Sequence, residues 1–210
     1  LKKAFFICFE MSTSTKSLSA SQTAVRFGVH QRTARLFMHK VREAMKSSGD
    51  FPMTGVVNVD EYVVGGYEEG KAVCAVELTD DGKVKRFYTF QIPDYSSKSL
   101  RKIFEKHIDK DARITTDKWK GYNPIAKDFD LTQILSGKGS KFKALHIMIH
   151  QVKSWIRTTY SWVSESNINR YFDEFCYRIN RSQTKDTIFN NLIKRMVKSD
   201  NITQQKIICA

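Results

Sequence analysis

The hydrophobic pattern of this chain changes its period near residue 54, and no other feature constrains the fold as strongly. β-Branched and aromatic residues dominate three successive segments, residues 54–64, 71–79 and 83–92. Gly65-Gly66 separates the first two segments, and Asp80-Asp81-Gly82, a sequence typical of a hairpin turn, separates the last two. We therefore expect three consecutive antiparallel strands.

Helices and further strands follow this set. We expect a helix that Ser96 opens and that ends near residue 107. Two more strands are expected at residues 112–116 and 131–135, with a short helix between them at 122–126. Beyond these strands the pattern is helical over residues 142–159, 165–181 and 185–198. This order of elements predicts an α/β fold, a ribonuclease H-like mixed sheet with flanking helices.

A small all-α domain of the helix-turn-helix type is expected before the sheet. Ser19 and Gln22 have the spacing of a capping box for a helix at residues 20–27, and Gly28 makes the turn to a second helix at 31–45. Such a second helix enters the major groove of DNA with its first residues nearest the bases. We expect its polar side to carry Gln31, Arg32, Arg35, His39, Lys40 and Arg42, of which Gln31, Arg32 and Arg35 contact DNA. A helical hairpin with a solvated basic face is the alternative.

The predicted division of the chain is a helix-turn-helix region at residues 1–50, a catalytic domain at 51–200 and a tail at 201–210. A linker-like stretch rich in small and polar residues, 47–54, separates the first two regions.

The charge of the chain indicates a polyanionic partner. Lys and Arg number 35 against 22 Asp and Glu, a formal net charge of +13. Such an excess favours nucleic acid, because neutralised phosphates release counterions. No apolar run approaches the ~20 residues of a spanning helix, so we expect no membrane partner. The four cysteines include no Cys-x-x-Cys pair, so we expect reduced core thiols in a cytoplasmic protein rather than a zinc site.

Two aspartates stand at the ends of strand-like segments. Asp60 follows Val56-Val57-Asn58-Val59, and Asp117 follows Ile114-Thr115-Thr116. Carboxylates from neighbouring strands can share two divalent ions about 3.5–4 Å apart, the arrangement that cleaves phosphodiesters, and Mg²⁺ (or Mn²⁺) prefers such oxygen ligands. A lone aspartate at such a position is more commonly a turn or helix cap. Glu61 is expected on the opposite face of its strand, either supporting the site or solvated.

A third metal ligand is expected from the helix after the last strand, but no carboxylate lies between Asp130 and Glu165. His146 is the best substitute on that helix, and Lys153, seven residues later, can hold a phosphate. Glu174 is the rival carboxylate, although Arg178 four residues on gives it an ordinary structural explanation. Further basic residues expected to contact DNA are Lys118, Lys120, Lys143 and Arg157.

The motifs resemble a known family. Val59-Asp60-Glu61 with Gly65-Gly66 resembles the V-D-E-x-x-x-G-G signature of DDE-type bacterial insertion-sequence transposases with an ISXO-like transposase domain. Thr116-Asp117 with Gly121-Tyr122 resembles the second-aspartate motif of that family. His146, Lys153 and residues 171–181 resemble its C-terminal helical signature, and His146 stands where many members carry Glu or Asn.

This resemblance implies a transposase that binds the ends of an insertion sequence, cleaves them with Mg²⁺ and joins the freed 3′-hydroxyl to target DNA. It implies Asp60, Asp117 and His146 as catalytic and metal-binding residues, double-stranded DNA as the partner, a homo-oligomer assembled on DNA and a location on the nucleoid. Two alternatives stay open: a catalytically decayed DNA-binding derivative, and a general nuclease of the same fold.

Overall fold

The computed structural model describes the chain except for residues 15, 65–69, 138–139, 161–162, 200–201 and 209–210. The predicted turn at Gly65-Gly66 lies outside the described residues. The chain divides into two compact units: a sheet unit, residues 48–153, and a helical unit, residues 1–47 with 154–210. The C-terminal helices, which we expected in the same domain as the sheet, thus group with the N-terminal helices.

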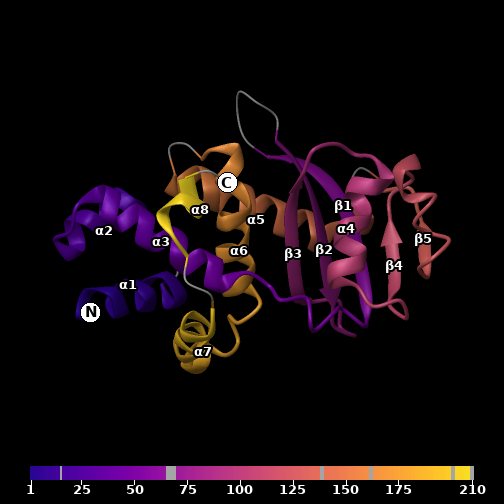
Figure 1. Ribbon diagram of the computed structural model, residues 1–210. Coiled ribbons are helices and arrows are strands. Elements are labelled where there is room, and N and C mark those ends of the chain that lie inside the picture. Colours follow the sequence, from indigo (N-terminus) through magenta and orange to yellow (C-terminus); the bar gives the residue numbers. More distant parts are fainter. Residues whose placement is uncertain (15, 65–69, 138–139, 161–162, 200–201, 209–210) are drawn as a thin grey trace. The chain divides into compact units, whose positions relative to one another are not determined.

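The sheet unit is built on five strands in the order β3-β2-β1-β4-β5 (Figure 1). Neighbours β1–β2 and β2–β3 are antiparallel, whereas β4 runs parallel to β1 and β5 parallel to β4. Gly82 has φ +75° in the β2–β3 turn, as the predicted hairpin motif requires. This mixed sheet with flanking helices is consistent with the predicted ribonuclease H-like fold. The strands are β1 (Val56–Val64), β2 (Gly70–Leu78), β3 (Val84–Ile92), β4 (Arg113–Thr116) and β5 (Leu131–Gln133).

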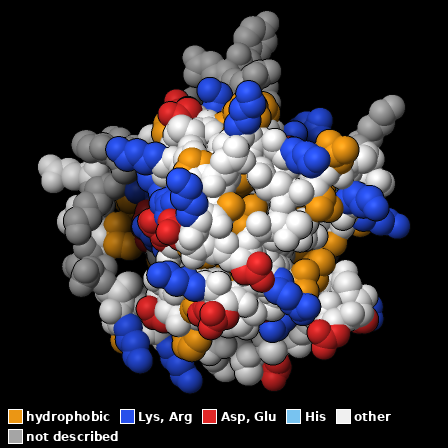
Figure 2. Space-filling model, turned by 90° about the vertical axis from the view of Figure 1, so that its right-hand side faces the viewer, with side chains coloured by type: hydrophobic (Ala, Val, Ile, Leu, Met, Phe, Trp, Pro, Cys, Tyr) orange, Lys and Arg blue, Asp and Glu red, His pale blue; other side chains and the backbone are white. Residues whose placement is uncertain are grey.

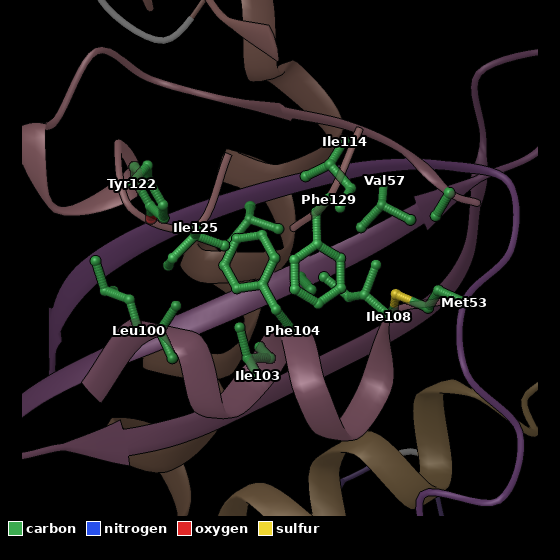
Figure 3. Close-up of a cluster of buried hydrophobic side chains, with 14 of the residues drawn as sticks. Met53, Val57, Leu100, Ile103, Phe104, Ile108, Ile114, Tyr122, Ile125 and Phe129 are labelled. Atoms are coloured by element: carbon green, nitrogen blue, oxygen red, sulfur yellow. The ribbon is translucent and has the colours of Figure 1, made fainter. Parts of the chain in front are cut away.

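Helix α4 (Ser97–His107) packs on the core of the sheet unit. It begins where predicted because the Ser96 hydroxyl accepts the Ser99 amide hydrogen at 3.4 Å. Its fully buried residues Leu100, Ile103 and Phe104 point toward Val57, Ile114, Tyr122, Ile125 and Phe129 (Figure 3). Val57 and Val59 belong to this core, so the odd-numbered residues of β1 face α4.

Helix α5 (Lys143–Thr159) follows a single 3₁₀ turn, η2 (Ser140–Phe142), and its residues up to Lys153 belong to the sheet unit. The Lys153 Nζ atom lies 5.8 Å from the ring centroid of Tyr62, an even-numbered residue of β1. The first part of α5 therefore meets the face of β1 that α4 does not. The predicted helix at 122–126 is instead a 3₁₀ turn, η1 (Lys120–Tyr122), followed by turns.

The helical unit buries apolar residues from both ends of the chain. Met11, Met38 and Val41 pack in one cluster with Tyr177 and Leu192. We did not predict the first and last helices of this unit. Besides the end of α5, the unit contains α1 (Lys2–Thr13), α2 (Ala20–Phe27), α3 (Gln31–Met45), η3 (Glu165–Asn167), α6 (Ile168–Ile179), α7 (Lys185–Lys198) and α8 (Gln204–Ile208).

Helices α2 and α3 have the predicted bounds, and both halves of the Ser19–Gln22 capping box are formed. Gly28 takes the left-handed conformation, φ +56°, in the turn between them. The expectation that His39 and Arg42 lie on a polar side is wrong, because both are 2% exposed. Arg42 instead donates from Nε to the buried Glu174 carboxylate at 2.8 Å.

Cys8, Cys74 and Cys176 are buried and unbridged, as expected for core thiols, and Cys209 lies outside the described residues. Among the described helices, none is both long and apolar enough to cross a membrane.

Candidate active site

Strand pairing brings the two predicted aspartates together. β1 and β4 are parallel with Asn58 opposite Thr115, so Asp60 and Asp117, each two residues further on, leave the paired region side by side. Asp60, Glu61 and Asp117 each offer a carboxylate oxygen, and these atoms lie within 4.8 Å of one another. Within the described part of the chain, this is the group of three potential metal ligands that the fold assembles.

Glu61 joins the group from the other face of β1. Its Oε2 atom accepts a hydrogen bond at 2.6 Å from the hydroxyl of Tyr122, a member of the α4-side core. The expected alternation of side chains along β1 therefore holds. The Glu61 carboxylate still reaches the aspartates because the pairing with β4 has ended, which leaves that side of β1 open. The sequence alone did not indicate this role, since Tyr122 lies 61 positions away.

Each aspartate is fixed by a backbone amide. Asp60 Oδ1 accepts the amide hydrogen of Glu61 at 2.9 Å, and Asp117 Oδ1 accepts that of Trp119 at 2.9 Å. The side-chain amide of Gln133, on β5, donates to the carbonyl oxygens of Asp117 (3.2 Å) and Trp119 (3.0 Å). These bonds orient both carboxylates before any ligand arrives.

Asp60, Glu61 and Asp117 are partly buried, and their carboxylates repel one another when ionised. Burial, with the charges of Glu61 and Asp117 adding to it, raises the pKa of the Asp60 carboxyl to about 7. Burial also raises the pKa of Glu61, against the opposing effect of the Tyr122 hydrogen bond. A site that accumulates uncompensated negative charge is suited to a hard divalent cation with oxygen ligands.

His146 lies beside the group, on the α5 side. Its Nε2 atom is 3.7 Å from Asp60 Oδ2, and its side chain is 45% exposed. The rival Glu174 belongs to the helical unit, where it is fully buried. Its Oε1 accepts from Ser17 at 2.7 Å and its Oε2 from Arg42, so its oxygens already have structural partners.

The predicted DNA-contacting residues fall in both units. Gln31, Arg32 and Arg35 are exposed at the start of α3, and Gln31 donates to Ser21 Oγ at 2.8 Å. Arg157, at the end of α5, is an exposed residue of the helical unit. In the sheet unit, Lys118, Lys120 and Lys143 are exposed and Lys153 is half-buried.

Figure 2 shows Lys and Arg side chains interspersed with Asp and Glu over one face of the molecule.

A comparison with protein families decides the identity of the domain. Residues 52–180, more than half of the chain, match the model of the ISXO2-like transposase domain. The chain belongs to this family. The match includes every strand of the sheet together with Asp60, Glu61, Asp117 and His146, whereas α2 and α3 lie outside it. No curated protein was found to match the chain. The family is one of DDE-type transposase domains, and the acidic cluster of Asp60, Glu61 and Asp117, which could bind a metal ion, lies within the matched residues.

Proposed function

We propose that this protein is a transposase that cleaves the ends of an insertion sequence and joins them to target DNA, at divalent metal held by Asp60, Glu61 and Asp117. The observation that carries the proposal is the convergence of these three carboxylates at the open end of the β1–β4 pair, inside the region that matches the transposase family. Mg²⁺ or Mn²⁺ is the cofactor proposed.

The reaction exchanges phosphorus–oxygen bonds. Hydrolysis breaks the bond between phosphorus and the 3′-oxygen and leaves a free 3′-hydroxyl; that hydroxyl then attacks a target phosphodiester and displaces another 3′-oxygen. A bound divalent ion supplies Lewis acidity toward the phosphate and lowers the pKa of an attacking water. Asp60 and Asp117 hold their carboxylates in place through the amides of Glu61 and Trp119.

Glu61 is proposed as the third carboxylate, in the absence of one on α5. The Tyr122 hydroxyl fixes it at 2.6 Å from the core side of the sheet. His146 is proposed as a further metal-binding and catalytic residue next to Asp60. Its imidazole can ligate a divalent ion or hold a proton at Nε2 without adding negative charge.

DNA contacts are proposed for both units. The exposed start of α3 offers Gln31, Arg32 and Arg35 to the major groove, as the second helix of a helix-turn-helix does. We propose phosphate contacts for Lys118, Lys120, Lys143, Lys153 and Arg157. By analogy with the family, we propose a homo-oligomer assembled on DNA in the nucleoid.

The test is a cleavage assay on duplexes that carry the DNA flanking the coding region, with Mg²⁺, with Mn²⁺ or with EDTA. We expect cuts at defined inverted-repeat ends with either metal, products that end in 3′-hydroxyls, and joining of those ends to a plasmid. Asp60→Asn and Glu61→Gln should abolish cleavage and His146→Ala should reduce it about 10-fold or more. Asp111→Asn, an exposed acid of the same unit, is the matched control.

The outcomes separate the alternatives. Binding of the ends with no cleavage in any metal would identify a DNA-binding derivative instead of a transposase. Cutting of unrelated duplexes without joining would identify a general nuclease. An unchanged rate for His146→Ala would remove that residue from the site.

A further inference from the structure

Trp119 is an exposed aromatic residue two positions after Asp117. Its side chain is 45% exposed, and it is not a member of the core cluster that contains its neighbour Tyr122. Lys118 and Lys120, on either side of it, are exposed. No ion pair of either lysine occurs among the described residues. Sites that bind single-stranded nucleic acid combine such elements: cations that contact the backbone phosphates and an aromatic ring on which a base stacks.

The Trp119 side chain is held rigidly although it is exposed. Its Nε1 atom donates to the carbonyl oxygen of Tyr95 at 3.0 Å. Its backbone amide donates to the Asp117 carboxylate, and its backbone carbonyl accepts from Gln133. A ring fixed in this way loses little conformational entropy when a ligand stacks on it.

Gly121 is the residue that allows this placement. A Cβ atom at position 121 would lie 2.7 Å from Trp119 Nε1, 2.8 Å from Trp119 Cδ1 and 2.8 Å from the Tyr95 carbonyl oxygen. Glycine is needed at position 121 because any side chain would collide with the indole. The left-handed conformation is not the reason, since the backbone of Gly121 does not adopt it. The contact fixes the pyrrole edge of the ring, which carries Nε1 and Cδ1, against the loop.

The same short loop connects the ring to the acids at both ends. Asp117 stands at its start, and Tyr122, which donates to Glu61, stands at its end. The residue that carries the ring is thus bonded through its own amide to one carboxylate of the cluster, at 2.9 Å, and lies three residues before the tyrosine that holds another. Bases inside a duplex have both faces covered, so a base can stack on this ring only when it is unpaired or turned out of the helix.

We propose that Trp119 is a stacking platform for an unpaired nucleobase next to the phosphate that is cut, with Lys118 and Lys120 binding the neighbouring phosphates. This proposal rests on the proposed function and deepens it, because it names the state of the DNA that the site accepts. Stacking on an aromatic ring tolerates any base, so Trp119 contributes affinity and position rather than sequence specificity.

The experiment measures binding of the full chain to a single-stranded oligonucleotide of about 12 nucleotides that contains 2-aminopurine, in EDTA. Stacking on the indole quenches the probe, and anisotropy of an end label gives the affinity. We expect Trp119→Ala to remove the quenching and to weaken binding by about 5- to 150-fold, the range of base–aromatic stacking. Trp119→Phe keeps an aromatic face and should keep most of the affinity. Phe51→Ala removes an aromatic that is 77% exposed in the same unit and should change nothing.

Trp119→Ala that binds and quenches like the parent would overturn the proposal. The proposal would also be overturned if Trp119→Phe, with unchanged thermal unfolding, lost as much affinity as Trp119→Ala. Because the assay contains no metal and needs no cleavage, its failure leaves the cleavage test of Asp60→Asn standing. Conversely, a chain that cuts no DNA would still give a readable stacking result.

Discussion

Asp60 couples the stability of the metal-free protein to pH. Its pKa is 3.8 in an unfolded chain and about 7 in the folded protein, so the folded state holds this proton more tightly. Stability contributed by the group is therefore greatest at low pH and falls as the pH rises from about 4 to 7. Above pH 7 the ionised Asp60 carboxylate lowers the free energy of unfolding by a constant amount, until a divalent cation binds it.

We predict that Asp60→Asn is more stable than the parent in EDTA, by an amount that grows from pH 4 to pH 7 and then stays level. About 1 kcal/mol corresponds to about 2–4 °C in melting temperature for a chain of this size. Thermal unfolding across pH measures the effect. Asp111→Asn should follow the parent, and Mg²⁺ should stabilise the parent but not Asp60→Asn. A constant difference between parent and variant at all pH values would contradict this prediction.

Helix α3 has an exposed start and a buried remainder, and this asymmetry predicts which of its cations contact DNA. Arg32 and Arg35 are exposed, whereas Arg42 is buried against Glu174. We predict that Arg32→Ala and Arg35→Ala each weaken duplex binding and reduce the slope of log affinity against log salt by about 1. Titrations at several salt concentrations measure this slope. Lys194→Ala, an exposed cation on α7, is the control, and equal slopes for all three variants would count against groove contact.

The buried pair of Arg42 and Glu174 fixes α3 to α6. The pair is 2% and 0% exposed, and the guanidinium also donates to the Tyr160 hydroxyl at 3.2 Å and lies 4.2 Å from the Tyr171 ring centroid. Removal of Arg42 leaves the buried Glu174 carboxylate with Arg178, whose Nη1 atom lies 3.5 Å from Oε1, as its remaining cationic partner.

We predict that Arg42→Met lowers the free energy of unfolding by up to about 3–5 kcal/mol, and that adding the neutral Glu174→Gln restores part of the loss. Urea unfolding measures both values, with Lys40→Met as the control on the same helix. A double variant less stable than Arg42→Met alone would show that packing, rather than the unpaired charge, sets the cost.

The elements that were predictable are those with local signals. Ser19, Gly28 and Ser96 mark helix ends through bonds within a few residues, so α2, α3 and α4 have the expected bounds. Helix α1 was missed because its apolar side chains are not confined to the buried stripe of Ile7, Cys8 and Met11. Phe5, Phe6 and Phe9 remain 44%, 51% and 46% exposed.

Of the site residues, only those whose position follows from the order of the strands could be predicted from the sequence. Asp117 directly follows β4, as expected, whereas Asp60 lies in the middle of β1, two residues beyond the last residue that pairs with β4. Parallel pairing of β1 with β4 brings the two aspartates together. Glu61 is held at the site by a hydrogen bond from Tyr122, 61 positions away in the sequence. Arg42 is buried rather than exposed because it pairs with Glu174, 132 positions away. Contacts over such separations come from tertiary folding, which no local pattern in a single sequence reports.

At the scale of the whole molecule, the helical unit is made from both ends of the chain. Met11, Met38 and Val41 from the first 47 residues share a core with Tyr177 and Leu192. Helices α1 and α3 are therefore part of a larger core that includes residues from the other end of the chain.

We predict that deletion of residues 1–47 also unfolds α6 and α7, because their apolar faces lose these partners. Far-UV circular dichroism should show a loss of helix greater than α1, α2 and α3 account for. A full-length chain with Arg32→Ala and Arg35→Ala should keep its helix content while losing DNA contacts. Retention of folded α6 and α7 after the deletion would contradict this prediction.

Asp60, Glu61 and Asp117 are the three carboxylates of the proposed metal site. The most direct test is to titrate the protein with Mn²⁺ to millimolar concentration and measure the free ion by electron paramagnetic resonance. We predict that the parent and Asp111→Asn bind Mn²⁺ equally, whereas Asp117→Asn and Glu61→Gln bind it at least about 10-fold more weakly. Binding by Asp117→Asn equal to that of the parent would contradict the proposed metal site.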